Sequence, residues 1–571
     1  MMFFILLFVL MLWPTFAWAC TTIVVGRSAS TTNTVLVAHN EDNPGRLFCS
    51  HDYVPPREGD GRLVRYEDGA ALIHKPTKSL GFYWCSVREE RGHSASDRFV
   101  NDRGVCLVTN NCRESRRDKP FDISDGGVWY ALRRAVAEGA RTAYHGLLIA
   151  TTLLNRYGYR DSGRTYTIAD STEAWILQIA AGKAYAAVRL GDSEVALIPN
   201  HYTLRSGDLR RPHLISPNLI EEAVARGWHR SCDVDHFDFA RAYQDPESWR
   251  LRGNVVRHIN LARALGAPLT LDDELPFALR PKWRLSPKSL WLMLADHYEG
   301  TEFEACQEFG DGTPHQSPDR RICTETTHDS SVFVTDNFAG KTGIMQCPGR
   351  PCTYPYFTTT LEEVREGLPP TFTPLGVENL HAALDDHCRA RPELLDDGPA
   401  CHKLWDWATA FNLRYSELRQ ALNQWKSETQ EQMEGLTLAE QDRVFAKRGR
   451  DFFEEGPAAP VKMSASHLTI AKGSGGEVTF TFPSPGELEE GTIRCGQSGL
   501  MPHRWAKPLV GSLVCGEAVC TVKFRAAELA EGAKNCKAHF FLTGRKADGR
   551  WFVGTASLKV EPRAFDELIG Q

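Results

Sequence analysis

Short apolar, β-branched runs separated by polar turns dominate the first part of the chain and predict strands. Residues 21–25 (Thr-Thr-Ile-Val-Val) form one such run, and residues 34–38 form a second. The polar stretch 28–33 between them is typical of a turn, so we expect a β-hairpin whose first strand begins directly after Cys20. Further strands are expected over residues 104–108, 174–179, 184–190 and 195–199.

The pattern becomes helical between residues 360 and 455. Apolar residues recur there at three- and four-residue spacing with charged residues between them, notably Leu404, Trp407, Phe411, Leu418 and Leu422. This spacing predicts amphipathic helices that cover part of a core.

The stretch 456–460 (Gly-Pro-Ala-Ala-Pro) predicts a linker, because glycine and proline interrupt regular structure. Residues 461–571 return to strand patterns, for example over 477–482 and 538–542. We therefore expect a main domain over residues 20–455 and a small all-β domain over 461–571. This tail has its own cysteines, enough for two internal disulfides: Cys495, Cys515, Cys520 and Cys536.

The first residues differ from the rest of the chain. An almost unbroken apolar run over 1–13 is followed by Ala17-Trp18-Ala19. An apolar core ending in an A-x-A site predicts a signal peptide over residues 1–19, although the usual positive charge before the core is absent. The alternative is a membrane anchor, but the run is shorter than the roughly 20 apolar residues of a spanning helix. We expect a secreted or periplasmic protein with no stable membrane span.

Composition narrows the class of protein. A chain of 571 residues exceeds one compact domain, and its 42% hydrophobic content supplies large cores. The formal net charge of -6 and the lack of a dense Lys/Arg run argue against a nucleic-acid partner.

The 16 cysteines suit an oxidising compartment if most of them are paired. Metal binding is the alternative use. The closest pairs, Cys347/Cys352 and Cys515/Cys520, have a C-x4-C spacing that is wide for a zinc site. No paired histidines follow them at zinc-finger distance, so we expect structural disulfides rather than metal ligation.

Cleavage after Ala19 would make Cys20 the first residue, with a thiol and a free α-amine on the same residue. An α-amine has an ordinary pKa of about 7.7–8.0, so it can accept the thiol proton near neutral pH. This pairing predicts an N-terminal nucleophile. An ordinary disulfide cysteine or a lipidated one is the alternative.

Ordered motifs support the first interpretation. Residues 20–26 (Cys-Thr-Thr-Ile-Val-Val-Gly) and 38–43 (Ala-His-Asn-Glu-Asp-Asn) open the series. Others follow at 101–105 (Asn-Asp-Arg-Gly-Val), 173–177 (Glu-Ala-Trp-Ile-Leu), 198–201 (Ile-Pro-Asn-His), 274–277 (Glu-Leu-Pro-Phe), 296–301 (Asp-His-Tyr-Glu-Gly-Thr) and 411–416 (Phe-Asn-Leu-Arg-Tyr-Ser). In this order the chain resembles the dipeptidase A family of cysteine N-terminal nucleophile hydrolases, whose wider relatives include secernins and the bile-salt hydrolase/penicillin V acylase group. The resemblance covers roughly residues 20 to 455.

The resemblance implies an α+β fold, the four-layer αββα sandwich of N-terminal nucleophile hydrolases, here with a helical extension and the all-β tail. It implies amide hydrolysis through an acyl-enzyme on Cys20, with a dipeptide or short peptide as substrate. No metal or organic cofactor is implied.

Several site residues follow from the same resemblance. Asp42 matches the aspartate that holds the α-amine. His39 replaces the arginine usual before Asn40, and a cation there could orient the thiol or meet a substrate carboxylate. Relatives place an oxyanion-hole amide at Asn110 or Asn111, which the sequence does not separate.

The resemblance also points to an amide, a late arginine and a cluster of acid/base residues. Asn200 matches another amide near the nucleophile. A late arginine is also expected, and Arg250 and Arg252 are both candidates for substrate binding. The run 296–299 (Asp-His-Tyr-Glu) could form an acid/base cluster, but we interpret it mainly as a structural signature.

Two other functions remain open. An amidase or acylase acting on a non-peptide or cell-wall amide would use the same catalytic centre, with only the pocket differing. A lipid-anchored exported binding protein is the alternative of another class. Ala17 and Trp18 fit a lipobox poorly, and lipidation would acylate the amine that catalysis needs.

Overall fold

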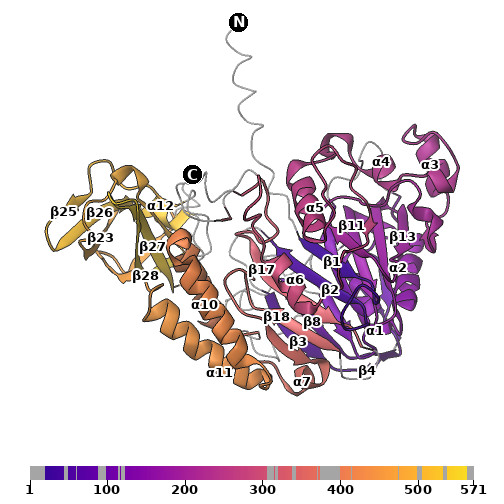
Figure 1. Ribbon diagram of the computed structural model, residues 1–571, viewed down its shortest axis with the longest axis horizontal. Coiled ribbons are helices and arrows are strands. Elements are labelled where there is room, and N and C mark those ends of the chain that lie inside the picture. The colour runs from indigo at the N-terminus through magenta and orange to yellow at the C-terminus, as the bar shows by residue number, and fades with distance from the viewer. Residues whose placement is uncertain are drawn as a thin grey trace, which may run out of the picture.

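The computed structural model describes residues 20–561 except 44–48, 60, 68, 88–97, 113–115, 117–121, 305–313, 316–318, 337–341, 370, 373–398, 413, 474, 498–504 and 532–536. The expected signal peptide and Cys536 lie outside the described residues. The chain is a mixed α/β protein with several sheets (Figure 1).

A seven-stranded antiparallel sheet, sheet I, contains the expected hairpin. β1 (Thr21–Val25) pairs with β2 (Leu36–Asp42), and β17 (Thr327–Val334) pairs with the other edge of β2. The first strand has the predicted bounds, whereas the second starts later and continues through the polar run at 39–42. The other strands of the sheet are β14 (Val195–Ile198), β16 (Ala278–Leu279), β18 (Gly343–Cys347) and β19 (Phe357–Thr360).

An eight-stranded antiparallel sheet, sheet II, contains the strands predicted over 104–108, 174–179 and 184–190, whereas the one predicted over 195–199 is β14 of sheet I. Its members are β3 (Cys49–Val54), β8 (Phe82–Val87), β9 (Arg98–Asn101), β10 (Cys106–Asn111), β11 (Tyr159–Ala169), β12 (Ala174–Gly182), β13 (Tyr185–Arg189) and β15 (His213–Ile215). Short strands beside it form two pairs, β4 (Arg57–Glu58) with β7 (Lys78–Ser79) and β5 (Leu63–Val64) with β6 (Ile73–His74).

The two sheets face one another across an apolar core, and helices cover their outer faces (Figure 1). Side chains alternate along β1, so Val24 enters the core between the sheets while Ile23 and Val25 pack on the helix side. The helices on sheet I include α5 (Arg252–Ala264) and α6 (Pro287–Leu294), and those on sheet II are α1 (Tyr130–Gly139) and α2 (Ala143–Tyr157). Shorter helices are α3 (Leu219–Ala225), α4 (Phe239–Tyr243) and α7 (Leu361–Glu366).

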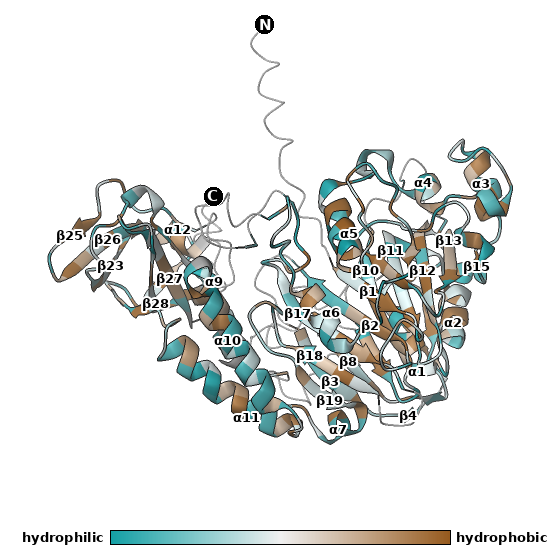
Figure 2. Ribbon diagram, viewed as in Figure 1, coloured by the Kyte–Doolittle hydropathy of each residue, from teal (hydrophilic) through white to brown (hydrophobic). Residues whose placement is uncertain are grey.

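The predicted helical segment consists of α9 (Pro399–Asn412), α10 (Tyr415–Met433) and α11 (Leu438–Gly449). Figure 2 shows hydrophilic and hydrophobic residues alternating along α10 and α11, as amphipathic spacing requires. Their apolar residues join the core on the helix side of sheet I. Ala458 of the expected linker is fully buried in the same core, so this residue packs against the helices instead of being exposed to solvent.

Residues 461–561 form two further sheets around their own core. One sheet contains β20 (Val461–Lys462), β22 (Thr469–Ala471), β24 (Arg494–Gln497), β27 (Lys537–Arg545) and β28 (Trp551–Glu561). The other contains β21 (Ser464–Ala465), β23 (Glu477–Pro483), β25 (Val514–Cys515) and β26 (Val519–Arg525). The short helix α12 (Ala526–Glu531) lies among them, so this tail is not purely β.

The expected disulfides appear in one place. The sulfurs of Cys515 and Cys520 lie 2.11 Å apart, at bonding distance. Cys49, Cys85, Cys323, Cys352 and Cys495, in contrast, are free thiols. The described part of the chain therefore lacks the broad disulfide network that the cysteine count suggested. Within that part, no helix is long and apolar enough to cross a membrane.

Candidate active site

The thiol of Cys20 lies between the two sheets, at the start of β1. It donates a hydrogen bond to Oε1 of Glu41 at 3.4 Å, and Glu41 Oε2 lies 3.1 Å from Nε2 of His39. All three side chains are buried. Because side chains alternate along strands, Cys20 on β1 and both His39 and Glu41 on β2 point to the same face of sheet I.

The environment of Cys20 keeps its thiol protonated. Burial raises the thiol pKa well above its ordinary value, and the negative charges of Glu41 and Asp42 raise it further. The main-chain N–H of Asp42 and the charge of Arg164 act in the opposite direction but do not compensate. The side chains around Cys20 therefore do not ionise it at neutral pH, and a nucleophilic thiolate requires a further base.

His39 is held by protein groups on both ring nitrogens. Thr22 Oγ1 donates to Asn110 Oδ1 at 2.6 Å, so Nδ1 of His39, 2.7 Å from the same oxygen, acts as the donor to Thr22. The other ring nitrogen faces Glu41. Burial lowers the pKa of His39, although Glu41 opposes this. Both ring nitrogens are thus held by protein groups, which favours the expected role of orienting the thiol, through Glu41, over that of meeting a substrate carboxylate.

Asn110 and Asn111 point to opposite faces of β10. The Asn110 amide nitrogen donates to the main-chain carbonyls of Cys20 and Ile198, both at 3.0 Å. Asn111 alternates with it and faces away from Cys20. Since an amide carries two hydrogens and both are used, Asn110 fixes the main chain of Cys20 and has no donor left for an oxyanion.

Arg257 on α5 is the arginine that reaches Cys20. Its Nη1 donates to the Cys20 carbonyl at 2.9 Å and to Thr21 Oγ1 at 3.0 Å. Its Nη2 donates to Oδ1 of Asn200 at 2.9 Å and of Asn254 at 2.7 Å. Asn200 is thereby linked to the nucleophile through Arg257.

The two arginines expected from the sequence lie elsewhere. The guanidinium of Arg250 donates to the main-chain carbonyl of Asp273 at 2.8 Å, and Arg252 pairs with Asp319 through a 2.9 Å contact. Neither contact involves Cys20. Sequence analysis missed Arg257 and Glu41. The sequence signal for Arg257 was the expected late arginine, which the resemblance placed a few residues too early, at Arg250 or Arg252.

Asp42 lies at the end of β2 with one oxygen satisfied and one not. Thr327 Oγ1 donates to Oδ1 at 2.5 Å, whereas the buried Oδ2 has no hydrogen-bond partner among the described residues. Burial raises the pKa of Asp42 to about 7, against the lowering effects of Thr327 and nearby arginines. A cation close to Oδ2 would stabilise the ionised form of this carboxyl group.

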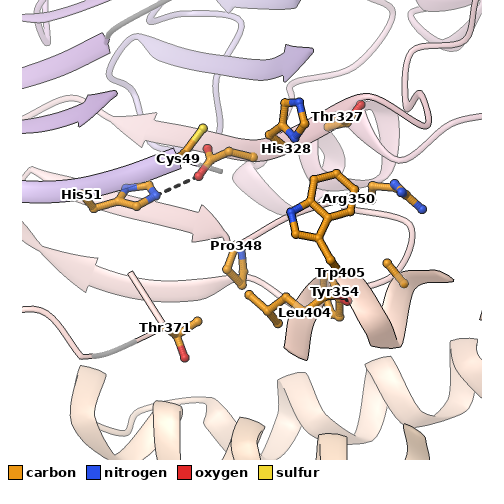
Figure 3. A pocket seen from close by; sticks show the side chains of 13 residues that line it. Cys49, His51, Thr327, His328, Pro348, Arg350, Tyr354, Thr371, Leu404 and Trp405 are labelled. Carbon is orange, nitrogen blue, oxygen red and sulfur yellow. Dashed lines mark hydrogen bonds and ion pairs between the residues drawn. The ribbon is translucent and has the colours of Figure 1, made fainter. Parts of the chain in front are cut away.

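A pocket opens two strands from Cys20 in the same sheet. Asp329 on β17 is paired with Glu41, the residue that receives the Cys20 thiol, so two strand spacings, about 10 Å, separate Cys20 from the pocket. Figure 3 shows His51 and Cys49 on one side and Trp405 on the other, with a dashed line from His51 to the carboxylate of Asp329. His51 Nε2 lies 2.9 Å from that carboxylate, and Arg98 also pairs with it.

Arg350 brings a positive charge to the opposite wall of this pocket (Figure 3). It is only 3% exposed, and its Nε and Nη1 have no hydrogen-bond partner among the described residues. Glu325 interacts with it electrostatically, and the Trp405 ring lies 5.6 Å from the guanidinium carbon. Buried guanidinium donors without acceptors are costly, so this wall is suited to an anionic group.

The sequence of this chain is similar to those of several proteins named dipeptidases or probable dipeptidases. A probable dipeptidase of Salmonella dublin is 23% identical over 340 residues, covering 55% of this chain and 74% of that protein. A probable dipeptidase of Latilactobacillus sakei is 23% identical, with 56% and 68% covered, and a dipeptidase of Bifidobacterium longum is 23% identical, with 51% and 61% covered. The family model described as "Peptidase family C69" matches residues 19–342, more than half of the chain, and includes Cys20, Glu41 and Arg257. The chain therefore belongs to peptidase family C69.

Proposed function

We propose that this peptidase is an exported cysteine dipeptidase, with Cys20 as its nucleophile and first residue after removal of residues 1–19. The observation that carries the proposal is the Cys20 thiol at the head of β1. The thiol donates a hydrogen bond to Glu41, and Asn110 and Arg257 donate hydrogen bonds to the main-chain carbonyl of Cys20. Relatives named dipeptidases support the substrate class.

The free α-amine would supply the missing base. The surroundings of Cys20 keep its thiol protonated, and a neutral amine on the same residue is positioned by covalent geometry to take that proton. The resulting ammonium would find a carboxylate in Asp42, whose Oδ2 is buried without a partner. The ammonium in turn would stabilise the ionised form of Asp42.

The reaction then proceeds through a thioester. The Cys20 sulfur bonds to the carbonyl carbon of the substrate, the carbon–nitrogen bond breaks, and the ammonium returns its proton to the leaving amine. Water, deprotonated by the amine, attacks the thioester, releasing the acid and restoring the thiol. Asn110 and Arg257 are positioning residues in this scheme, because they hold the Cys20 main chain rather than the substrate.

The pocket beside Asp329 would receive one end of a short peptide. An extended residue spans about 3.3–3.6 Å, so about three residues separate a scissile carbonyl at Cys20 from a pocket about 10 Å away. The unsatisfied donors of Arg350 suit the terminal carboxylate. A terminal carboxylate at this distance favours a short peptide with about three residues beyond the scissile bond over a long chain.

We further propose that the facing sheets with outer helices are the αββα sandwich of N-terminal nucleophile hydrolases, and that residues 461–571 are a separable module. The separate core of the tail supports this, with a small apolar contact to α9 through Ala410, Trp505, Phe541 and Val553. A chain ending at residue 460 should stay soluble and hydrolyse dipeptides within a few-fold of the full chain. Loss of activity in a folded truncation would contradict the boundary.

Cysteine substitutions test the proposed nucleophile. Cys20→Ala should lower the rate of dipeptide hydrolysis by at least about 1000-fold without changing the fold, because the thioester forms on the Cys20 sulfur. Cys232→Ala is the matched control, since this cysteine is exposed and lies outside the site. Wild-type turnover in Cys20→Ala would exclude the mechanism.

A further inference from the structure

A second chemical cluster lies behind sheet I, away from the Cys20 thiol. It consists of two histidines and two cysteines from separate segments: His297, His315, Cys323 and Cys352. One donor atom from each lies within 4.8 Å of all the others. All four side chains are buried, with His315 the most exposed at 9%.

The distances in this cluster match a tetrahedral metal centre. Zn–N bonds of about 2.05 Å and Zn–S bonds of about 2.3 Å give N–N edges of about 3.3 Å and N–S edges of about 3.6 Å. The observed separation of the Nε2 atoms of His297 and His315 is 3.2 Å. His315 Nε2 lies 3.5 Å from Cys352 Sγ and 3.8 Å from Cys323 Sγ.

Hydrogen bonding alone does not account for this convergence. Three polar atoms meet a single ring nitrogen, Nε2 of His315, which offers at most one hydrogen or one lone pair. The four potential ligand atoms converge on one centre that is shielded from water. A cation at that centre would satisfy all of them together.

The surroundings also orient one ligand. Glu299 Oε1 lies 3.1 Å from His297 Nδ1, which places the proton on Nδ1 and leaves the lone pair of Nε2 facing the cluster. Carboxylates commonly support zinc-bound histidines in this way. Glu299 in turn lies 3.4 Å from Tyr415 and Arg419 on α10, so the arrangement is tied to the helical segment.

We propose that His297, His315, Cys323 and Cys352 form a structural zinc site. Four protein ligands of the Cys2His2 type leave no open position, which is typical of structural rather than catalytic zinc. Metal ligation by these residues is the use of cysteine that the sequence analysis set aside in favour of structural disulfides.

A metal in this site would stabilise the position of β2, the strand that carries Glu41 and Asp42. Asn40 on β2 donates its amide to the carbonyls of Leu294 and Ile322 at 2.8 and 2.9 Å, and these residues lie close in sequence to His297 and Cys323. Zinc would thereby fix three loops and α10 on the outer face of sheet I. It would act on catalysis only through the placement of β2.

Metal analysis of the purified full-length protein tests the proposal. About one zinc ion per chain is expected in the wild type. The zinc content should be at least tenfold lower in Cys323→Ser, Cys352→Ser and His297→Gln. Cys347→Ser and Cys85→Ser should keep their zinc, because Cys347 lies outside every cluster and Cys85 belongs to a different one. Cys20→Ala should also keep it, which separates this site from the proposed nucleophile.

A measurement on the wild type covers the case in which those variants do not fold. Replacing the metal with Co²⁺ should give the intense visible absorption of a tetrahedral site together with thiolate charge-transfer bands. A metal-free protein with a Cys323–Cys352 disulfide in a non-reducing peptide map would overturn the proposal. So would zinc that persists in Cys323→Ser and disappears in Cys85→Ser.

Discussion

The Cys20 thiol donates to Glu41 Oε1 at 3.4 Å, and the other oxygen of that carboxylate lies 3.1 Å from His39. The proposed nucleophile therefore contacts a carboxylate rather than a histidine. A direct cysteine–histidine pair would activate the thiol, whereas a buried carboxylate raises its pKa. In the proposed mechanism, this relationship is the reason that the α-amine of Cys20 acts as the base.

Replacing Glu41 with Gln should lower the pKa of Cys20, because it removes a negative charge beside the thiol. The rate of iodoacetamide alkylation at Cys20 should then reach half its plateau at a lower pH than in the wild type. Glu41→Asp keeps the charge and should remain closer to the wild-type curve. Superimposable curves for the wild type and Glu41→Gln would show that Glu41 does not act on the thiol.

Arg257 should matter for turnover more than for substrate affinity. Arg257→Lys keeps the positive charge but loses the fork that reaches Cys20 and Asn200, so we expect kcat to fall by at least about tenfold with little change in KM. Arg252→Lys, at the start of the same helix, serves as the control and should leave kcat unchanged. If the two substitutions lowered kcat equally, Arg257 would not be a positioning residue for Cys20.

Asp42 gives a pH-dependent test of its pairing with the α-amine. With Cys20 still joined to Ala19, burial holds the pKa of Asp42 at about 7, above its ordinary value of 3.8. A raised carboxyl pKa contributes stability that is present below the unfolded value and lost as pH rises through the folded one. In a chain kept uncleaved by Ala19→Arg, the Tm should therefore fall relative to its Asp42→Asn counterpart as pH rises from about 4 to about 7.

In the cleaved protein the α-ammonium should stabilise ionised Asp42, so this divergence should shrink or reverse. The Tm of wild type and Asp42→Asn, measured over the same pH range in both forms, gives the comparison. The same divergence before and after cleavage would mean that Asp42 does not hold the amine.

Arg350 should set affinity for the terminal carboxylate of the substrate. Arg350→Met should raise KM for a peptide with three residues beyond the scissile bond by about 10- to 100-fold, the range expected for a lost charge-assisted hydrogen bond. With the amidated form of the same peptide, which lacks that carboxylate, wild type and variant should behave alike. Metal content should be measured in parallel, because Cys352 lies nearby in the chain. A KM effect of the same size on both substrates would argue against direct recognition.

Much of the framework was predictable because burial acts on regular patterns. The run at 21–25 is β-branched and became β1 with the same bounds, and the spacing of Trp407 and Phe411 gave α9. The predicted strand ended at residue 38 because His39, Asn40 and Glu41 are polar and resemble a turn, whereas β2 continues to Asp42. In the structure they are buried and paired with Thr22, Leu294 and Cys20, which no local pattern reveals.

The site was only partly predictable for a related reason. Cys20 and Asp42 follow from motifs in one stretch of sequence, whereas Arg257 and the cluster of His297 and Cys352 depend on contacts between distant segments. The ligands of the cluster are widely and unevenly spaced, so no metal-binding motif marks them. Alternation along β10 separated Asn110 from Asn111, which sequence could not do.

The most direct test of the central claim is the mass of the amino-terminal peptide from the active protein, before and after inactivation with iodoacetamide. We expect a peptide that begins at Cys20 with an unmodified amine and gains one alkyl group on sulfur in proportion to the activity lost. An active protein that retains residues 1–19, carries an acyl group on the amine, or keeps its activity with Cys20 fully alkylated would contradict the account.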